Sequence, residues 1–85
     1  MVLRIERVSE NGGIRLCLSG ELRSSDLKDV QTEIAKIAPR IVLDLAELSL
    51  VDFDSVRWLA AIETAGFKVV NSAPYIREWM RQEKS

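Results

Sequence analysis

A short and nearly continuous apolar segment, Ile41-Val42-Leu43-Asp44-Leu45, constrains the fold of this chain more than any other feature. Apolar runs of this length are typical of strands that are buried on both faces, as in parallel sheets. Pro39 lies just before the segment and is expected to end a preceding helix, because the residue before a proline avoids the helical region. The sequence therefore predicts an inner strand that directly follows a helix.

Two strands and a helix are expected before this inner strand. Residues 2–8 and 14–19 roughly alternate apolar and polar side chains, and Asn11-Gly12-Gly13 between them is a turn signal, because Asn and Gly tolerate positive φ. The two segments are predicted to form a β-hairpin, with Gly20 ending its second strand. Ser24-Ser25-Asp26 then offers N-cap residues for an amphipathic helix. The apolar positions of that helix recur every three or four residues, at Leu27, Val30, Ile34 and Ile37.

Two further helices and one strand are expected after the inner strand. A helix is predicted from about Ser55 to Ala65, closed by Gly66. Residues 67–70 read as a strand, and Ser72 is the predicted cap of a last helix that carries Pro74 in its first turn. The resulting order, β-β-α-β-α-β-α, predicts a single α/β domain over residues 1–85. Its architecture is a small mixed four-stranded sheet, an N-terminal hairpin followed by βα units, packed with three helices.

Composition excludes several classes of function. Twelve basic and thirteen acidic residues leave no broad basic field for nucleic acid. The chain has no histidine and only one cysteine, Cys17, which excludes an internal disulfide, the usual zinc sites and Ser-His-Asp triads. No apolar stretch approaches a membrane span, and no signal-peptide core is evident. We therefore expect a cytoplasmic protein that is not an enzyme, with no catalytic residue, metal, cofactor, nucleic-acid partner or direct membrane insertion.

Several segments of the chain resemble one protein family. They are Leu18-Ser19-Gly20-Glu21-Leu22, the inner strand with Asp44, Asp52 eight residues later, and Val69-Val70-Asn71 before Pro74. Their order and spacing are similar to those of the STAS family, which includes the anti-sigma-factor antagonists, and the resemblance covers nearly the whole chain. It implies a STAS-like fold in which the loop 50–55 and the helix 56–65 dock onto an anti-sigma partner.

The sequence departs from this family at the start of the second helix. Family antagonists typically read Asp-Ser-Ser/Thr-Gly there, and a partner kinase phosphorylates the second hydroxyl. This chain reads Asp52-Phe53-Asp54-Ser55, so Asp54 stands at the phosphorylation-site position and Ser55 is only a shifted acceptor. Arg23 replaces an acid that many members carry, and we predict that Arg23 pairs with Asp54. The resemblance thus implies an antagonist-like module without the usual phosphorylation switch.

Each residue at this position also has a plain structural interpretation. Asp54 is a suitable helix N-cap. Phe53 is expected to anchor its loop in the core, although an exposed Phe53 would be a binding anchor. Trp58 lies at the edge of the apolar stripe of its helix and is expected to be partly buried, with contact to a partner as the alternative. The partner-binding residues implied by the resemblance are Arg23, Asp52, Phe53, Asp54, Ser55, Arg57 and Trp58.

Three functions are compatible with these residues. The first is a non-catalytic protein–protein interaction module in a bacterial signalling pathway that regulates transcription, with an anti-sigma factor or kinase-like regulator as its partner. The second, also implied by the resemblance, is a cytoplasmic subunit of a membrane transporter complex, such as one for lipids. The third is a small-molecule sensor, for which no motif is present. A homodimer is compatible with all three.

Overall fold

The computed structural model describes residues 2–37 and 40–84, and its element order is the predicted one. Pro39, the predicted helix stop, lies outside the described residues. The elements are β1 (Leu3–Glu10), β2 (Gly13–Leu22), the 3-10 turn η1 (Ser24–Asp26), α1 (Leu27–Ile37), β3 (Ile41–Val51), α2 (Phe53–Thr64), β4 (Lys68–Val70) and α3 (Pro74–Glu83). The α/β class with a four-stranded mixed sheet and three helices is therefore confirmed.

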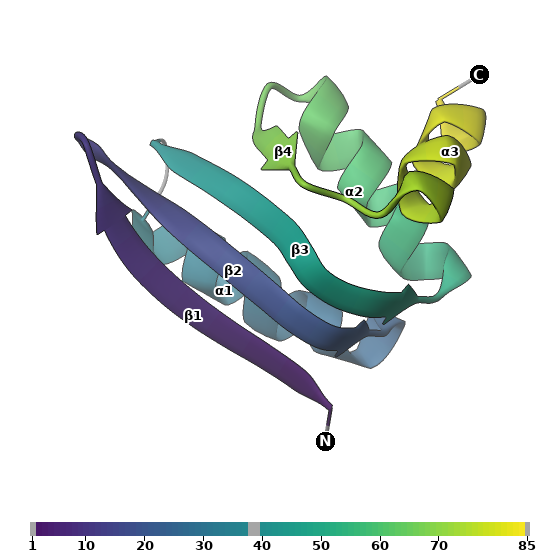
Figure 1. The fold of residues 1–85 in the computed structure, drawn as a ribbon, viewed down its shortest axis with the longest axis horizontal. Helices are drawn as coiled ribbons and strands as arrows, with labels where there is room; N and C mark the ends of the chain where they lie inside the picture. The colour runs from purple at the N-terminus through teal and green to yellow at the C-terminus, as the bar shows by residue number, and fades with distance from the viewer. Residues whose placement is uncertain (1, 38–39, 85) are drawn as a thin grey trace.

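The sheet has the strand order β1-β2-β3-β4 (Figure 1). Strands β1 and β2 form the predicted antiparallel hairpin, in which Gly12 takes a φ of +78° at the turn. Strand β3 runs parallel to both β2 and β4. The helices α1 and α2 each connect two of the parallel strands, as such connections require.

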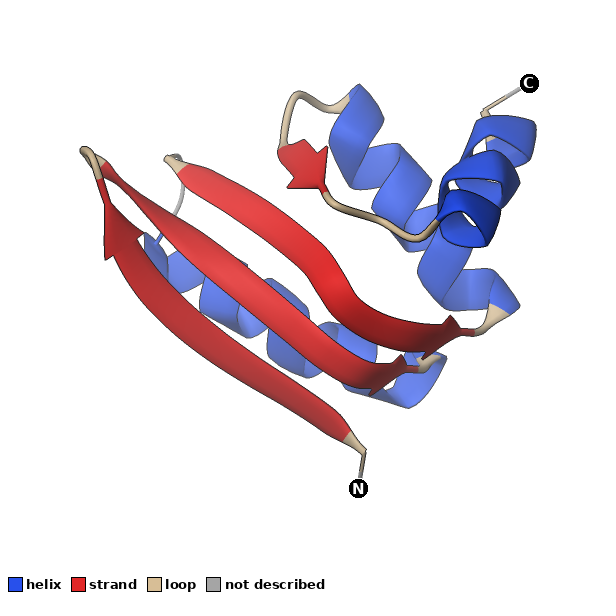
Figure 2. Cartoon of the chain, in the orientation of Figure 1, coloured by secondary structure: helices blue, strands red, loops and turns tan. Residues whose placement is uncertain are grey.

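Helices cover only one face of this sheet, which corrects the prediction that β3 is buried on both faces. Leu43 and Leu45 of β3 are fully buried, together with Leu16 and Leu18 of β2. Val42 and Asp44 alternate with these residues and are only partly buried. Figure 2 shows α1 behind the first three strands, and no described helix passes in front of them. We call the uncovered side the open face.

Gly20 lies within β2 and does not end it, because the strand continues to Leu22. Its φ is +93°, and a Cβ atom there would lie 1.9 Å from the carbonyl oxygen of Val2. The register with β3 shifts on both sides of this residue, as expected at a bulge. Gly20 thus lets β2 bend and continue, where the sequence predicted an end.

Of the predicted helix ends, the C-terminus of α2 is confirmed, and the predicted N-cap of α3 is wrong. Gly66, with a φ of +112°, closes α2 as predicted, and the N–H of Phe67 donates to the carbonyl of Ile62 at 3.0 Å. The N-cap of α3 is Ala73, so the prediction for Ser72 is wrong, whereas Pro74 does occupy the first turn. Ile76 and Met80 of α3 are fully buried in the core, so α3 packs its apolar face inward.

Candidate functional site

The loop predicted to dock a partner lies where β3 ends and α2 begins, next to η1 (Figure 1). The alternation of β3 stops after Leu45. In the last part of the strand Leu48 and Val51 are buried, while Leu50 is 38% exposed. Asp52 follows as the N-cap of α2, and its backbone N–H donates to the carbonyl of Leu22 at 3.3 Å. The end of β2 therefore helps to hold the start of α2 in place.

The Asp52 carboxylate connects two segments that are distant in sequence. One oxygen accepts from the N–H of Ser55 at 2.9 Å, and the other accepts from the N–H of Ser24 at 2.8 Å. Burial alone would raise the pKa of Asp52, but hydrogen bonds from Ser55 and Ser24 outweigh it, so the pKa is lowered. Asp52 is thus a charged anchor for the loop, and both of its oxygens are already engaged.

Asp54 is exposed in the first turn of α2, and it is not the cap. Its charge is favourable there because the helix N-terminus carries partial positive charge. The predicted pairing with Arg23 is wrong, since the guanidinium of Arg23 binds Glu21 at 2.6 Å. Arg23 and Glu21 are two residues apart on an extended chain and so point to the same side, whereas Asp54 belongs to a helix.

Ser55 is fully buried, with 0% of its surface exposed, and its hydroxyl oxygen has no hydrogen-bond partner among the described residues. A kinase needs the hydroxyl to be accessible, and a phosphate carries up to two negative charges. The burial of Ser55 therefore argues against this residue as a phosphate acceptor.

Phe53 is 51% exposed, so the prediction that it anchors the loop in the core is wrong. The guanidinium carbon of Arg57, one turn along α2, lies 5.5 Å from the centre of its ring, within the range of a cation–π contact. Arg57 also lies 3.8 Å from Glu83 of α3. We call Leu50, Phe53, Asp54 and Arg57 the loop surface.

Two aromatic residues flank the loop surface. Trp58 is partly buried and packs against the core, as predicted. Tyr75 of α3 was not singled out in the sequence, yet it is 50% exposed and its hydroxyl donates to the carbonyl of Ser49 at 2.6 Å. Tyr75 directly follows Pro74 at a helix start, and nothing in this position predicts that its side chain is exposed. Three of the five exposed large apolar residues in the described chain, Leu50, Phe53 and Tyr75, thus come from β3, α2 and α3 near this end of the sheet.

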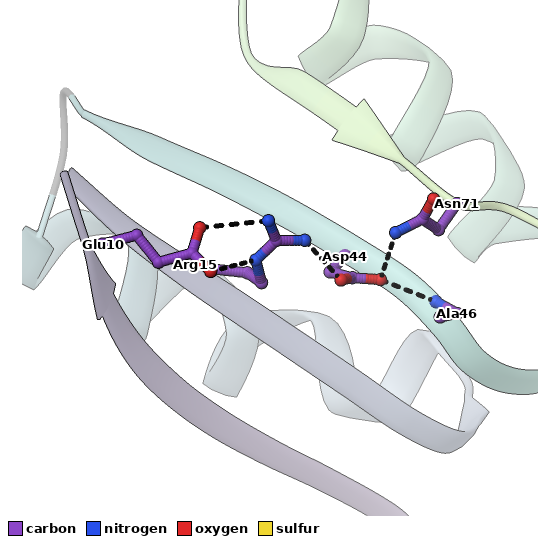
Figure 3. Close-up of polar contacts among 5 residues, drawn as sticks. All are labelled: Glu10, Arg15, Asp44, Ala46 and Asn71. Atoms are coloured by element: carbon purple, nitrogen blue, oxygen red, sulfur yellow. Dashed lines mark hydrogen bonds and ion pairs between the residues drawn. The ribbon is translucent and has the colours of Figure 1, made fainter.

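A second polar cluster, which the sequence did not predict, crosses the open face (Figure 3). The guanidinium of Arg15 donates to Asp44 at 2.7 Å and to Glu10 at 3.0 Å. Asp44 also accepts from the backbone N–H of Ala46 at 2.9 Å and from the side-chain amide of Asn71 at 3.3 Å. The cluster spans the sheet from the end of β1 to the residue after β4. The sequence feature that could have predicted this cluster is Asp44, the single acidic residue within the apolar run 41–45.

The charge of Asp44 is stabilised within this cluster. Burial would raise the pKa of Asp44, but hydrogen bonds from Ala46, Arg15 and Asn71 outweigh it, and the pKa is lowered. Cys17 lies on the same face, and its pKa is raised by burial and by the charge of Asp44. A thiol with a raised pKa is a weak nucleophile at neutral pH. The cluster is thus an electrostatic connection between strands.

Neither polar region brings together ligands for a metal ion. Within residues 2–37 and 40–84, no group of three or more His, Cys, Asp or Glu side chains is placed to hold one. A hollow of about 340 Å³ opens at the other end of the sheet, between the hairpin turn, the start of β3 and the loop before β4. Its lining includes Gly12, Arg40, Phe67 and Lys68. This hollow bears on the small-molecule hypothesis, and it lies at the other end of the sheet from the loop surface.

No protein-family model matches this sequence, and a comparison with curated proteins also gives no match. None of the helices in the described part of the chain has the length and apolar character needed to cross a membrane. The resemblance to the STAS family therefore depends on the sequence segments quoted above.

Proposed function

We propose that this chain is a STAS-like, non-catalytic protein–protein interaction module similar to an anti-sigma-factor antagonist. In this proposal the loop surface and α2 contact an anti-sigma factor or a kinase-like regulator in the bacterial cytoplasm. The observation that carries the proposal is the half-exposed Phe53 at a helix start that Asp52 holds in place.

The loop surface contains residue types that are common at protein–protein interfaces. Exposed aromatic and arginine side chains are enriched among the residues that dominate binding energy at interfaces. The contact between Phe53 and Arg57 orders both side chains before a partner arrives, which reduces the entropy lost on binding. Asp54 adds a negative charge, so a partner with a basic residue opposite the helix start is favoured.

The proposal includes no phosphorylation switch at this helix. Asp54 supplies a permanent charge where the family carries a hydroxyl, and the hydroxyl of Ser55 is buried. A carboxylate carries less charge and fewer oxygens than a phosphate. The module is therefore expected to bind its partner constitutively.

Capture from a lysate of the source cells, followed by mass spectrometry, tests this function. The wild-type chain is expected to retain an anti-sigma factor or a related kinase, and Phe53→Ala and Arg57→Ala are expected to lose it. Lys36→Ala is the matched control. The side chain of Lys36 in α1 is 57% exposed and forms an ion pair with Glu33. The side chain of Arg57 is similarly 62% exposed and forms an ion pair with Glu83. Equal capture by all variants would contradict the assignment of the loop surface, and specific capture of a transporter subunit would favour the alternative function.

A further inference from the structure

The outer edge of β1 is a long and unpaired strand edge. Strand β1 has eight residues and pairs only with β2, whereas the other edge strand, β4, has three. Figure 1 shows β1 along one side of the sheet, with no other described element beside its outer edge. An edge of this length presents a row of unpaired backbone N–H and C=O groups that can pair with another strand.

The hydrogen-bond pattern of the hairpin shows which residues of β1 face outward. The N–H of Glu21 donates to the carbonyl of Val2 at 3.0 Å, so Val2 directs its carbonyl toward β2. Because this direction alternates along an antiparallel strand, Arg4, Glu6 and Val8 also point their backbone groups toward β2. Leu3, Ile5 and Arg7 therefore present theirs to solvent.

The side chains of β1 on the open face are exposed and alternate in a self-complementary order. Arg4 and Glu6 have side chains that are 76% and 61% exposed, and Val2 and Val8 on either side of them are 48% and 43% exposed. Val2 and Val8 are the two exposed large apolar residues of the described chain that lie in β1 or directly before it. The order along the strand is apolar, basic, acidic, apolar. When a second copy of the strand runs antiparallel to the first, each basic residue can face an acidic one and each apolar residue an apolar one.

We propose that two copies of this chain associate through β1, paired antiparallel about a two-fold axis at Ile5. In this register Arg4 lies opposite Glu6 of the second copy, and Val2 lies opposite Val8. Ile5 faces its own copy, and the outward backbone groups of Leu3, Ile5 and Arg7 form the hydrogen bonds. The two sheets then become one continuous sheet.

Charge selects this register over its neighbours. If the two-fold axis moves from Ile5 to residue 4, Arg4 of one copy lies opposite Arg4 of the other. If the axis moves to residue 6, Glu6 lies opposite Glu6. Like charges directly opposite one another on neighbouring strands are destabilising, while opposite charges are stabilising. The same charges therefore protect the edge against unrelated strands and favour one symmetric, closed pairing.

This dimer goes beyond the proposed function and leaves the loop surface free. Strand β1 forms one edge of the sheet, and the helices α2 and α3 lie toward the opposite edge (Figure 2). A dimer through β1 would therefore present two loop surfaces at once. Such bivalency strengthens binding to a partner that is itself dimeric or clustered.

Sedimentation equilibrium over a range of concentrations tests the proposal. The wild-type chain is expected to show a monomer–dimer equilibrium, and Glu6→Lys or Arg4→Glu to raise its Kd about tenfold or more. The double variant Arg4→Glu/Glu6→Arg restores opposite charges and is expected to restore the dimer. A wild-type chain that stays monomeric up to about 1 mM, or a double variant no better than the single ones, would overturn the proposal. Because Arg4 and Glu6 are exposed, thermal melts of the variants should match the wild type.

Cysteine cross-linking tests the register directly. In a Cys17→Ala background, Val2→Cys and Val8→Cys are made as separate variants. Opposite residues of this type lie about 4.5 Å apart at Cα, within the range of a disulfide. A mixture of the two variants is expected to cross-link on oxidation, while each variant alone is not. Cross-linking of either variant with itself, or none in the mixture, would refute the register at Ile5.

Discussion

Asp44 and Asp52 are eight residues apart, within and just after β3, and they stabilise the chain in different ways. Asp44 binds the side chains of Arg15 and Asn71 and one nearby backbone N–H. Asp52 accepts from two backbone N–H groups, one of which is 28 residues away. If the Asp44 carboxylate is lost, the side chains of Arg15 and Asn71 can rotate to new hydrogen-bond partners. If the Asp52 carboxylate is lost, the backbone N–H groups that it accepts from are fixed by the fold and cannot. Asp52 therefore maintains the path of the chain, while Asp44 connects neighbouring strands.

The largest expected effect comes from the loss of the Asp52 carboxylate. Asp52→Ala leaves the N–H groups of Ser24 and Ser55 without their acceptors, and we expect the free energy of unfolding to fall by about 2 kcal/mol. Urea denaturation measures this change. Asp54→Ala is the matched control, because Asp54 is exposed on the next turn of chain, and its effect should stay within about 0.5 kcal/mol. Equal losses in the two variants would remove the distinction between anchor and surface acid.

A smaller effect is expected from the Asp44 cluster, and it should depend on pH. The pKa values of Asp44 and Asp52 are lowered in the folded chain. Each carboxylate therefore contributes its full stabilisation above the unfolded pKa, about 3.9. This contribution is lost as the pH falls through the folded pKa. Asp44→Asn is expected to cost about 1 kcal/mol at pH 7 and to reduce the loss of stability between pH 5 and pH 3.

Urea denaturation at several pH values checks the Asp44 prediction. The wild-type chain provides the reference slope of stability against pH. Glu47→Gln is a suitable control, because Glu47 is an exposed acid on the same strand. An Asp44→Asn variant whose stability falls as steeply as that of the wild type would show that the cluster does not favour the ionised form.

The smallest expected effect is at Ser55, which directly follows Asp54 of the loop surface. Its buried hydroxyl has no hydrogen-bond partner within the described part of the chain, and an unsatisfied buried polar group costs free energy. We therefore expect Ser55→Ala to leave the free energy of unfolding unchanged or to raise it by up to about 1 kcal/mol. Differential scanning calorimetry measures the shift. A clear loss of stability would mean that the hydroxyl makes a contact that supports the Asp52 anchor.

Features that depend on neighbouring residues were predictable from the sequence. The hairpin turn at Gly12 and the stop at Gly66 were confirmed because positive φ is a local property that glycine adopts without strain. Helix α1 was predicted from its three- and four-residue spacing, and its buried residues, Val30 and Ile34, belong to that spacing. The α/β class followed from the order of such local signals.

Features of the candidate site were harder to predict, because several residues competed for one role. Asp52 and Asp54 are both good caps, and only the position of the strand end, with Ser24 nearby, selects Asp52. Arg23 had an acid within reach two residues earlier, at the end of β2, so it pairs with Glu21, and Asp54 remains exposed. The exposure of Phe53 depends on where α2 begins, which shifted by two residues from the prediction.

What the residues encode locally is therefore the sequence of strands, turns and helices and the residues that fill the core. What required packing in three dimensions is the open face of the sheet, the Asp44 cluster and the exposed edge of β1. Local signals arise from contacts within a few residues, where the chain geometry is nearly the same in every protein. The other features arise between residues that are far apart in the sequence, such as Arg15 and Asp44, which are 29 residues apart. Their positions are settled only when all the elements pack together.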